Sequence, residues 1–99
     1  NGVLLNRYRD GRDSLGRHAD REDDLVEGSP IVGVSLGATR LMRIRPAGGR
    51  VAVEVRQPLR DGSLLLMHGD CQRALTHEIR KEPGVTGERI SLTFRTVRT

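Results

Sequence analysis

Ninety-nine residues are enough for one small domain with a single modest core. The chain is 35% hydrophobic and 30% charged, as a globular protein is, and no apolar run approaches the roughly 18 residues of a membrane span. Its net charge of +4 is uneven: residues 1–30 hold five arginines against seven acidic residues, and residues 31–99 hold twelve basic against six acidic residues. A basic surface suits a polyanion such as nucleic acid, although a solvated arginine-rich surface explains it too.

In chain order, short apolar or alternating runs predict β-strands throughout, at residues 3–8, 31–36, 40–45, 51–55, 63–67, 75–79 and 90–94. Turn-forming residues separate them, at residues 10–11, 21–29, 46–49, 58–62 and 83–87. No stretch has a convincing helical period. The single cysteine, Cys71, excludes an internal disulfide, which fits a cytoplasmic protein. About eight short strands with frequent turns predict an all-β fold, namely a sandwich, a jelly roll or a barrel.

Two histidines and a carboxylate form the most distinctive chemical pattern. His18 and Asp20 are two residues apart, so in an extended segment their side chains share a face. His77 offers a second imidazole, although His68 competes for that place. Two histidines with one carboxylate form the facial triad of non-haem Fe(II) oxygenases, which leaves three positions open for a bidentate co-substrate and dioxygen. The pair His18-x-Asp20 alone is weak, because a surface histidine beside a capping aspartate is common.

The last predicted strand carries two arginines on one face. With the two-residue period of a strand, Arg89, Ser91, Thr93 and Arg95 lie together, and the apolar residues between them face the other way. Arginines that face inward need anions, because an unpaired buried charge is very costly. A dicarboxylate such as 2-oxoglutarate supplies one anion at each end. The alternative is an edge strand with both arginines in solvent.

The first predicted strand repeats this logic. Asn6 and Tyr8 share a face with Leu4, and an amide and a phenol at that spacing can donate hydrogen bonds to carboxylate oxygens. Taken alone, these residues fit the polar outer face of an ordinary strand equally well.

Together these residues resemble the AlkB family of Fe(II)- and 2-oxoglutarate-dependent dioxygenases, which dealkylate nucleic acids. The matching segments run from about Val3 to Val97 and are Leu5-Asn6-Arg7-Tyr8, His18-x-Asp20, residues 29–37, residues 62–67, His77, and Arg89-x-Ser91-Leu92-Thr93-Phe94-Arg95. The resemblance implies a double-stranded β-helix, or jelly roll, as the catalytic core. It also implies oxidative removal of alkyl groups from base nitrogens in DNA or RNA, the chemistry of alkylation-damage repair.

The resemblance further implies a role for each site residue. His18, Asp20 and His77 would bind Fe(II), beside which dioxygen reacts. Arg89 with Tyr8 would hold the distal carboxylate of 2-oxoglutarate, and Arg95 with Asn6 would hold the end that chelates iron. The full co-substrate set is Leu4, Asn6, Tyr8, Arg89, Ser91 and Arg95, where Ser91 replaces an asparagine that many members carry.

The resemblance says less about the substrate than about the metal and the co-substrate. Glu22 falls where the family places an acidic residue that contacts the exocyclic amine of the damaged base. The family's nucleotide-recognition lid lies N-terminal to such a core, and we expect residues 1–99 to be one core domain without it. The expected protein is a monomer that binds alkylated DNA or RNA and no membrane. Two alternatives remain: an oxygenase that acts on a protein or small molecule, and an inactive truncated core.

Overall fold

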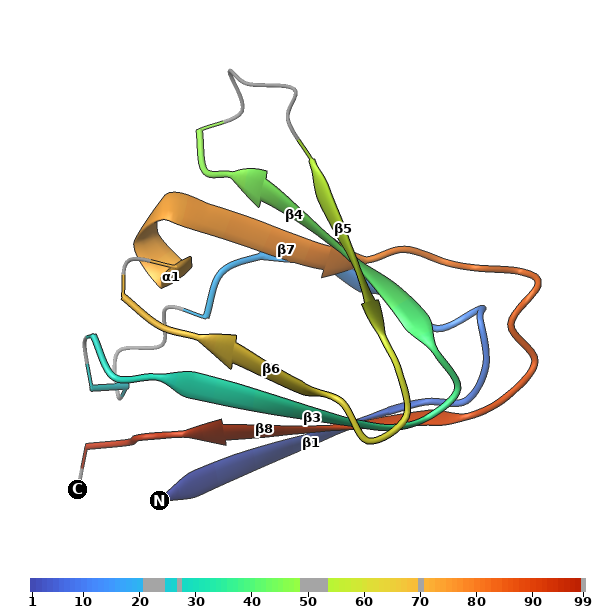
Figure 1. Ribbon diagram of the computed structural model, residues 1–99, viewed down its shortest axis with the longest axis horizontal. Helices are drawn as coiled ribbons and strands as arrows, with labels where there is room; N and C mark the ends of the chain where they lie inside the picture. The colour runs from blue at the N-terminus through green and yellow to red at the C-terminus, as the bar shows by residue number, and fades with distance from the viewer. Residues whose placement is uncertain (21–24, 27, 49–53, 70, 99) are drawn as a thin grey trace.

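The computed structural model describes residues 1–20, 25–26, 28–48, 54–69 and 71–98. Within them, two four-stranded antiparallel sheets face each other (Figure 1). The first sheet has the order β1 (Gly2–Tyr8), β8 (Arg89–Arg95), β3 (Ile31–Gly37) and β6 (Leu64–Met67). The second has the order β2 (Leu15–His18), β7 (Leu75–Ile79), β4 (Arg40–Pro46) and β5 (Val55–Leu59). The short helix α1 (Cys71–Ala74) leads into β7.

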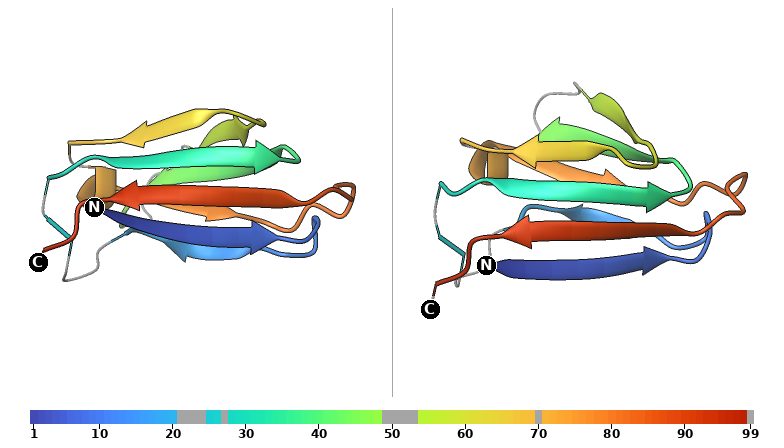
Figure 2. Two further views of the ribbon diagram at one scale, coloured as in Figure 1. Left: turned by 90° about the horizontal axis from the view of Figure 1, so that it is seen from below. Right: turned by 60° about the horizontal axis from the view of Figure 1, so that its bottom comes forward.

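Successive strands alternate between the two sheets, except at the β4–β5 hairpin, and this alternation is the wiring of a jelly roll. The predicted mainly-β jelly roll is therefore confirmed. Figure 2 shows β6, β3, β8 and β1 side by side as one layer, with the second sheet behind it. Within the described ranges, no helix is long and apolar enough to cross a membrane.

Part of the space between the sheets is an apolar core. Tyr8 from the first sheet packs with Met42, Leu59 and Ile79 from the second. Strand register explains the cluster, because Leu15 and Met42 both lie opposite Ile79 and so form one row across three strands. Burying a large apolar side chain contributes roughly 1.5–3 kcal/mol.

A buried arginine ties the loops to this core. Arg40 is only 1% exposed and donates to the Glu82 carboxylate at 3.2 Å. It also donates to three backbone carbonyls, those of Asp10, Asp13 and Arg80, at 3.2, 2.9 and 2.7 Å. Its guanidinium carbon lies 5.6 Å from the centre of the Tyr8 ring. Arg40 thus fixes the β1–β2 and β7–β8 connections around Tyr8.

The outer face of the first sheet is apolar. The period that turns Arg89 and Ser91 inward turns the residues between them outward, and cross-strand pairs such as Val3 with Phe94 continue the outer face. Six large side chains on this face are 42% to 71% exposed, namely Val3, Leu5, Leu36, Leu64, Leu66 and Phe94. The sheet therefore has its polar side inside and its apolar side outside.

Three details differ from the sequence predictions, and the first is that β2 lies in a segment for which the sequence predicts no strand. The break predicted at residues 58–62 begins too early, because β5 continues through Pro58 to Leu59. β5 is an edge strand, where a residue without an N–H is tolerated. Helix α1 is too short to give a helical period in the sequence. Most of the strand predicted at 51–55 lies outside the described residues, and β5 begins at Val55.

Candidate metal and co-substrate site

Two histidines lie opposite each other on neighbouring strands. β2 and β7 are antiparallel and pair His18 with His77, and the two ring centroids are 4.3 Å apart. His77 faces the interior because it lies two residues before the core residue Ile79 on β7. The alternation that builds the core therefore also brings the two imidazoles together.

Asp20 follows the end of β2 and turns its carboxylate toward both rings. Its Oδ1 lies 3.4 Å from His18 Nε2, and its Oδ2 lies 3.9 Å from His77 Nε2. The backbone N–H of Asp20 donates to Gln72 Oε1 at 2.7 Å. Gln72 belongs to α1, so the short helix positions the carboxylate.

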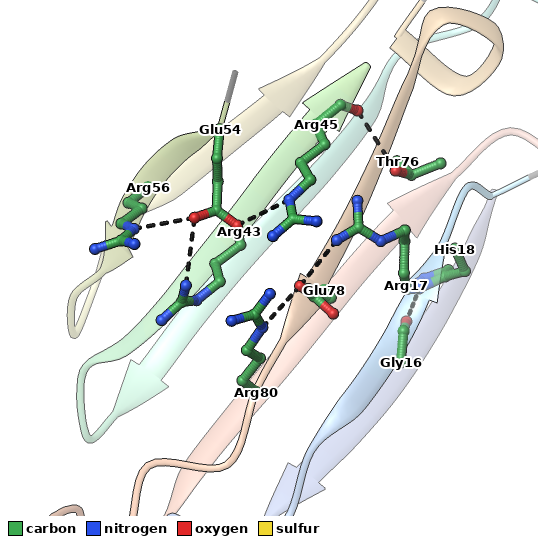
Figure 3. Close-up of polar contacts among 10 residues, drawn as sticks. All are labelled: Gly16, Arg17, His18, Arg43, Arg45, Glu54, Arg56, Thr76, Glu78 and Arg80. Atoms are coloured by element: carbon green, nitrogen blue, oxygen red, sulfur yellow. Dashed lines mark hydrogen bonds and ion pairs between the residues drawn. The ribbon is translucent and has the colours of Figure 1, made fainter. Parts of the chain in front are cut away.

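These three side chains form a group in which the candidate ligand atoms lie within 4.8 Å of one another. His18 Nδ1 lies 2.8 Å from the Gly16 carbonyl (Figure 3). Because a carbonyl only accepts hydrogen bonds, Nδ1 carries the proton in this contact and Nε2 keeps its lone pair for a metal. Burial, helped by His18 and opposed by Asp20, lowers the pKa of His77 and so favours its neutral, metal-binding form. His68 is exposed and lies outside this group.

A cavity of about 240 Å³ lies between the sheets beside the His-Asp-His group. Its lining includes every residue predicted for the co-substrate: Leu4, Asn6, Tyr8, Arg89, Ser91 and Arg95. The register of β1 and β8 brings them together, because it pairs Asn6 with Ser91 and Tyr8 with Arg89. Their individual roles stay predictions.

Arg89 is buried in this cavity and leans along β8. It lies opposite Gly37, yet its Nη2 donates at 2.9 Å to Ser35 Oγ, and Ser35 lies opposite Ser91. The guanidinium therefore points toward the far end of β8. Burial lowers the pKa of Arg89, and within the described ranges its Nε and Nη1 have no hydrogen-bond partner. A buried guanidinium with two open donors fits the carboxylate of a bound anion.

Three positioning residues were missed by sequence reasoning. Ser35 gave a weak signal, since it shares the inward face of β3 with Ile31 and is a hydroxyl within an apolar run. Gln72 and Arg40 gave none, because they act through contacts with distant segments. Glu22, the predicted contact to the base, lies outside the described residues.

The geometry agrees with comparisons to known proteins. The sequence profile described as "2OG-Fe(II) oxygenase superfamily" matches residues 1–95. The chain belongs to the 2OG-Fe(II) oxygenase superfamily. Among its superfamily relatives, human "DNA oxidative demethylase ALKBH2" is 43% identical over 104 aligned residues, which cover 98% of this chain and 40% of that protein. Rat "Alpha-ketoglutarate-dependent dioxygenase alkB homolog 3" is 41% identical, with 98% of this chain and 35% of that protein covered.

These superfamily relatives confirm the predicted resemblance to the AlkB family. The chain spans about 40% of the length of the human relative that it matches. The cupin domain of Drosophila melanogaster CENP-C has the same fold, with a TM-score of 0.66, 12% identity, and coverage of 95% of this chain and 59% of that chain. At such low identity the likeness concerns the fold alone.

Proposed function

We propose that this chain is the catalytic core of an Fe(II)- and 2-oxoglutarate-dependent dioxygenase that removes alkyl groups from bases of DNA or RNA. The observation that carries the proposal is the convergence of His18, Asp20 and His77 beside a cavity lined by Arg89, a buried arginine whose Nε and Nη1 have no partner among the described residues. Two neutral imidazoles and a carboxylate suit ferrous iron. Membership of the superfamily supports both iron and 2-oxoglutarate.

The chain's part in the metal site is to supply three ligands. His18 and His77 would hold the ion through Nε2, and Asp20 through a carboxylate oxygen. Such a three-residue set would leave the ion free to bind 2-oxoglutarate and dioxygen as well. Once bound, iron and 2-oxoglutarate supply the oxidising chemistry. The Gly16 carbonyl keeps the His18 ring in its tautomer, and Gln72 keeps Asp20 in place.

The two arginines of β8 hold the two ends of 2-oxoglutarate. Arg89, beside the Tyr8 ring at 5.0 Å, takes the distal carboxylate, and Arg95 with Asn6 takes the end nearer the iron. Six residues span roughly 20 Å of strand, so the side chains must lean toward each other to hold one small molecule. The hydrogen bond from Arg89 to Ser35 supports this, because it directs the guanidinium toward Arg95. Leu4 and Ser91 complete the lining of the pocket.

The substrate is an alkylated nucleic acid base. The name of the relative "DNA oxidative demethylase ALKBH2" supports DNA. Glu22 accepts a hydrogen bond from the exocyclic amine of alkylated adenine or cytosine, because a carboxylate can only accept. Thymine and uracil lesions present a carbonyl at that edge, which the carboxylate repels.

The deciding experiment is formaldehyde release from an oligonucleotide with one N-methylated base, in the presence of Fe(II), 2-oxoglutarate and oxygen. The wild-type chain is expected to form formaldehyde and succinate in equal amounts, and Asp20→Ala is expected to form neither. His68→Ala is the matched control, because His68 is exposed and outside the ligand group, and it keeps both products.

Other results would contradict the proposal in different ways. Succinate without formaldehyde points to an oxygenase for a protein or small molecule. No succinate from a wild-type chain that binds metal points to an inactive core. Full activity of Asp20→Ala removes the carboxylate from the metal site.

A further inference from the structure

Among the described residues, five arginines and two glutamates gather on the outer face of the second sheet (Figure 3). We name this surface the arginine face, and its members are Arg17, Arg43, Arg45, Arg56, Arg80, Glu54 and Glu78. Strand register assembles it, because Arg43 lies opposite Glu78 on β7 and opposite Arg56 on β5. The alternation that turns His77 into the site turns Glu78 out onto this face.

The two glutamates of the arginine face are more buried than the arginines that contact them. Glu54 contacts three of the arginines at 3.1–3.3 Å, and Glu78 contacts the other two at 3.0 and 3.2 Å. The glutamate side chains are 12% and 14% exposed, whereas those of Arg56 and Arg80 are 60% and 46% exposed. Five cations against two anions leave a surplus of three positive charges, directed outward.

Much of the hydrogen-bonding capacity of these arginines is open. A guanidinium has five N–H donors, and in the described part of the chain each of the five contacts its glutamate through a single nitrogen. Planar guanidinium groups with outward donors match phosphate oxygens bidentately. Arg43 and Arg56 also stand directly opposite each other, and Glu54, which contacts both, supplies one negative charge for these two and for Arg45.

The arginine face adjoins the proposed metal site. Arg17 precedes His18 on the edge strand β2. Thr76, which precedes His77, donates to the carbonyl of Arg45 at 3.4 Å. Arg17 and Arg45 therefore lie next to the strand positions of the metal ligands, on the opposite side of the same sheet. Four strands span roughly 14 Å, and one nucleic acid strand places about four phosphates in that length.

We propose that the arginine face binds the sugar–phosphate backbone of the nucleic acid whose base enters the metal site. The identity of the polyanion rests on the proposed function, whereas the charge and the geometry of the face are independent of the metal. Contacts to phosphates carry no base information, so the face holds flanking nucleotides of any sequence.

The test is the binding of a labelled, unmethylated single-stranded oligonucleotide, followed by fluorescence anisotropy over a range of salt concentrations without iron or 2-oxoglutarate. The variant Arg43→Gln/Arg80→Gln takes one arginine from each glutamate. Its slope of log K against log salt is expected to be shallower by about 1.4, at about 0.7 for each lost phosphate contact, and its affinity at low salt to be lower by about tenfold or more. An unchanged slope overturns the proposal.

Controls separate a local contact from overall charge. Arg9→Gln/Arg12→Gln removes the same charge from two exposed arginines of the β1–β2 turn, at the other end of β2 from His18, and leaves the slope unchanged. If the slope falls equally in Arg43→Gln/Arg80→Gln and Arg9→Gln/Arg12→Gln, net charge alone explains the change, and the proposal is overturned. Arg43→Lys/Arg80→Lys keeps the charge and the slope.

Two further arms complete the design. If circular dichroism shows that the glutamine double is unfolded, the single variant Arg56→Gln on the edge strand replaces it, with an expected change in slope of about 0.7. In a competition experiment, polyglutamate and an unlabelled oligonucleotide of equal charge each displace the labelled oligonucleotide. If polyglutamate competes equally well, the arginine face binds acidic proteins instead, and the proposal is overturned. Because no metal is present, a failure of the formaldehyde assay does not affect this reading.

Discussion

Replacing Arg89 with methionine tests whether this arginine anchors an anion or supports the fold. Arg89 is 3% exposed, has one hydrogen bond to Ser35, and leaves two nitrogens without partners among the described residues. Arg40 is a matched control, because it is 1% exposed and lies beside the same Tyr8 ring, at 5.6 Å against 5.0 Å. All three nitrogens of Arg40 have protein partners.

In the ligand-free chain the two substitutions have different effects. Arg40→Met removes the donor from Glu82 and three carbonyls, and breaking a buried pair costs about 3–5 kcal/mol, less here because Glu82 is 31% exposed. Arg89→Met removes open donors whose burial costs about 1–3 kcal/mol each. Replacing a buried ion with an apolar side chain of similar volume is often neutral or stabilising. Arg89→Met is therefore expected to unfold at or above the wild-type temperature, and Arg40→Met well below it.

With 2-oxoglutarate the order is expected to be reversed: Arg89→Met loses most of the stabilisation that the ligand gives, and Arg40→Met keeps it. Loss of a charge-assisted contact of about 1.5–3 kcal/mol weakens binding roughly tenfold to a hundredfold. Ligand at a hundred times the wild-type Kd stabilises the wild type by about 2.7 kcal/mol, but a variant that binds a hundredfold more weakly by only about 0.4 kcal/mol. Thermal unfolding with Mn(II) in place of iron measures both quantities. An undiminished ligand-induced shift in Arg89→Met, or its loss in Arg40→Met alone, would refute the reasoning.

Acid titration tests the arginine face, because the hydrogen bond from Arg56 is the main reason that the pKa of Glu54 is below its ordinary value of 4.5. A carboxyl whose pKa is lowered in the folded chain stabilises the fold at any pH above its ordinary pKa, and this stabilisation is lost as the pH falls through the pKa of the folded chain. Arg56→Gln should therefore raise the pKa of Glu54 in an NMR titration, and acid unfolding should begin at a higher pH. Glu22→Gln should shift the ratio of demethylation rates from N3-methylcytosine toward N3-methylthymine, and an unchanged ratio removes Glu22 from base recognition. Leu64→Lys/Leu66→Lys should lower the temperature of thermal unfolding very little, because these side chains are 71% and 56% exposed; a large drop would contradict their exposure in the folded chain.

Strand period carries most of what the sequence predicts correctly. Asn6 with Tyr8, and Arg89 with Ser91, share faces because facing is a local property of alternating residues. The same period turns the residues between them, Arg7 and Ile90, to the opposite face of the sheet. Most strand positions follow from the same runs. One exception is β2, whose sequence Leu-Gly-Arg-His has only one large apolar residue, and another is the end of β5, where Pro58 misleads because edge position is not visible locally.

Contacts between distant segments lie beyond this kind of reasoning. His68 competes with His77 as the partner of His18 when the residues are considered alone; the family resemblance favours His77, and the antiparallel register of β2 and β7 places it opposite His18. The hydrogen bond from Asp20 to Gln72 and the contacts of Arg40 with backbone carbonyls have no sequence period at all. Each depends on where a loop passes, which the alternation of apolar residues does not encode.

The first sheet, whose polar face points inward and whose apolar face points outward, links ligand binding to stability. Its inward face gives Asn6, Ser91 and Arg89 to the cavity, so few of its side chains join the apolar core around Tyr8. A buried guanidinium with open donors raises the free energy of the ligand-free fold. An anion that fills those donors removes the penalty in the same step in which it binds. The side chains that make this sheet a poor core are therefore the ones through which a dicarboxylate would stabilise the whole chain, since anything that binds only the folded state shifts the unfolding equilibrium.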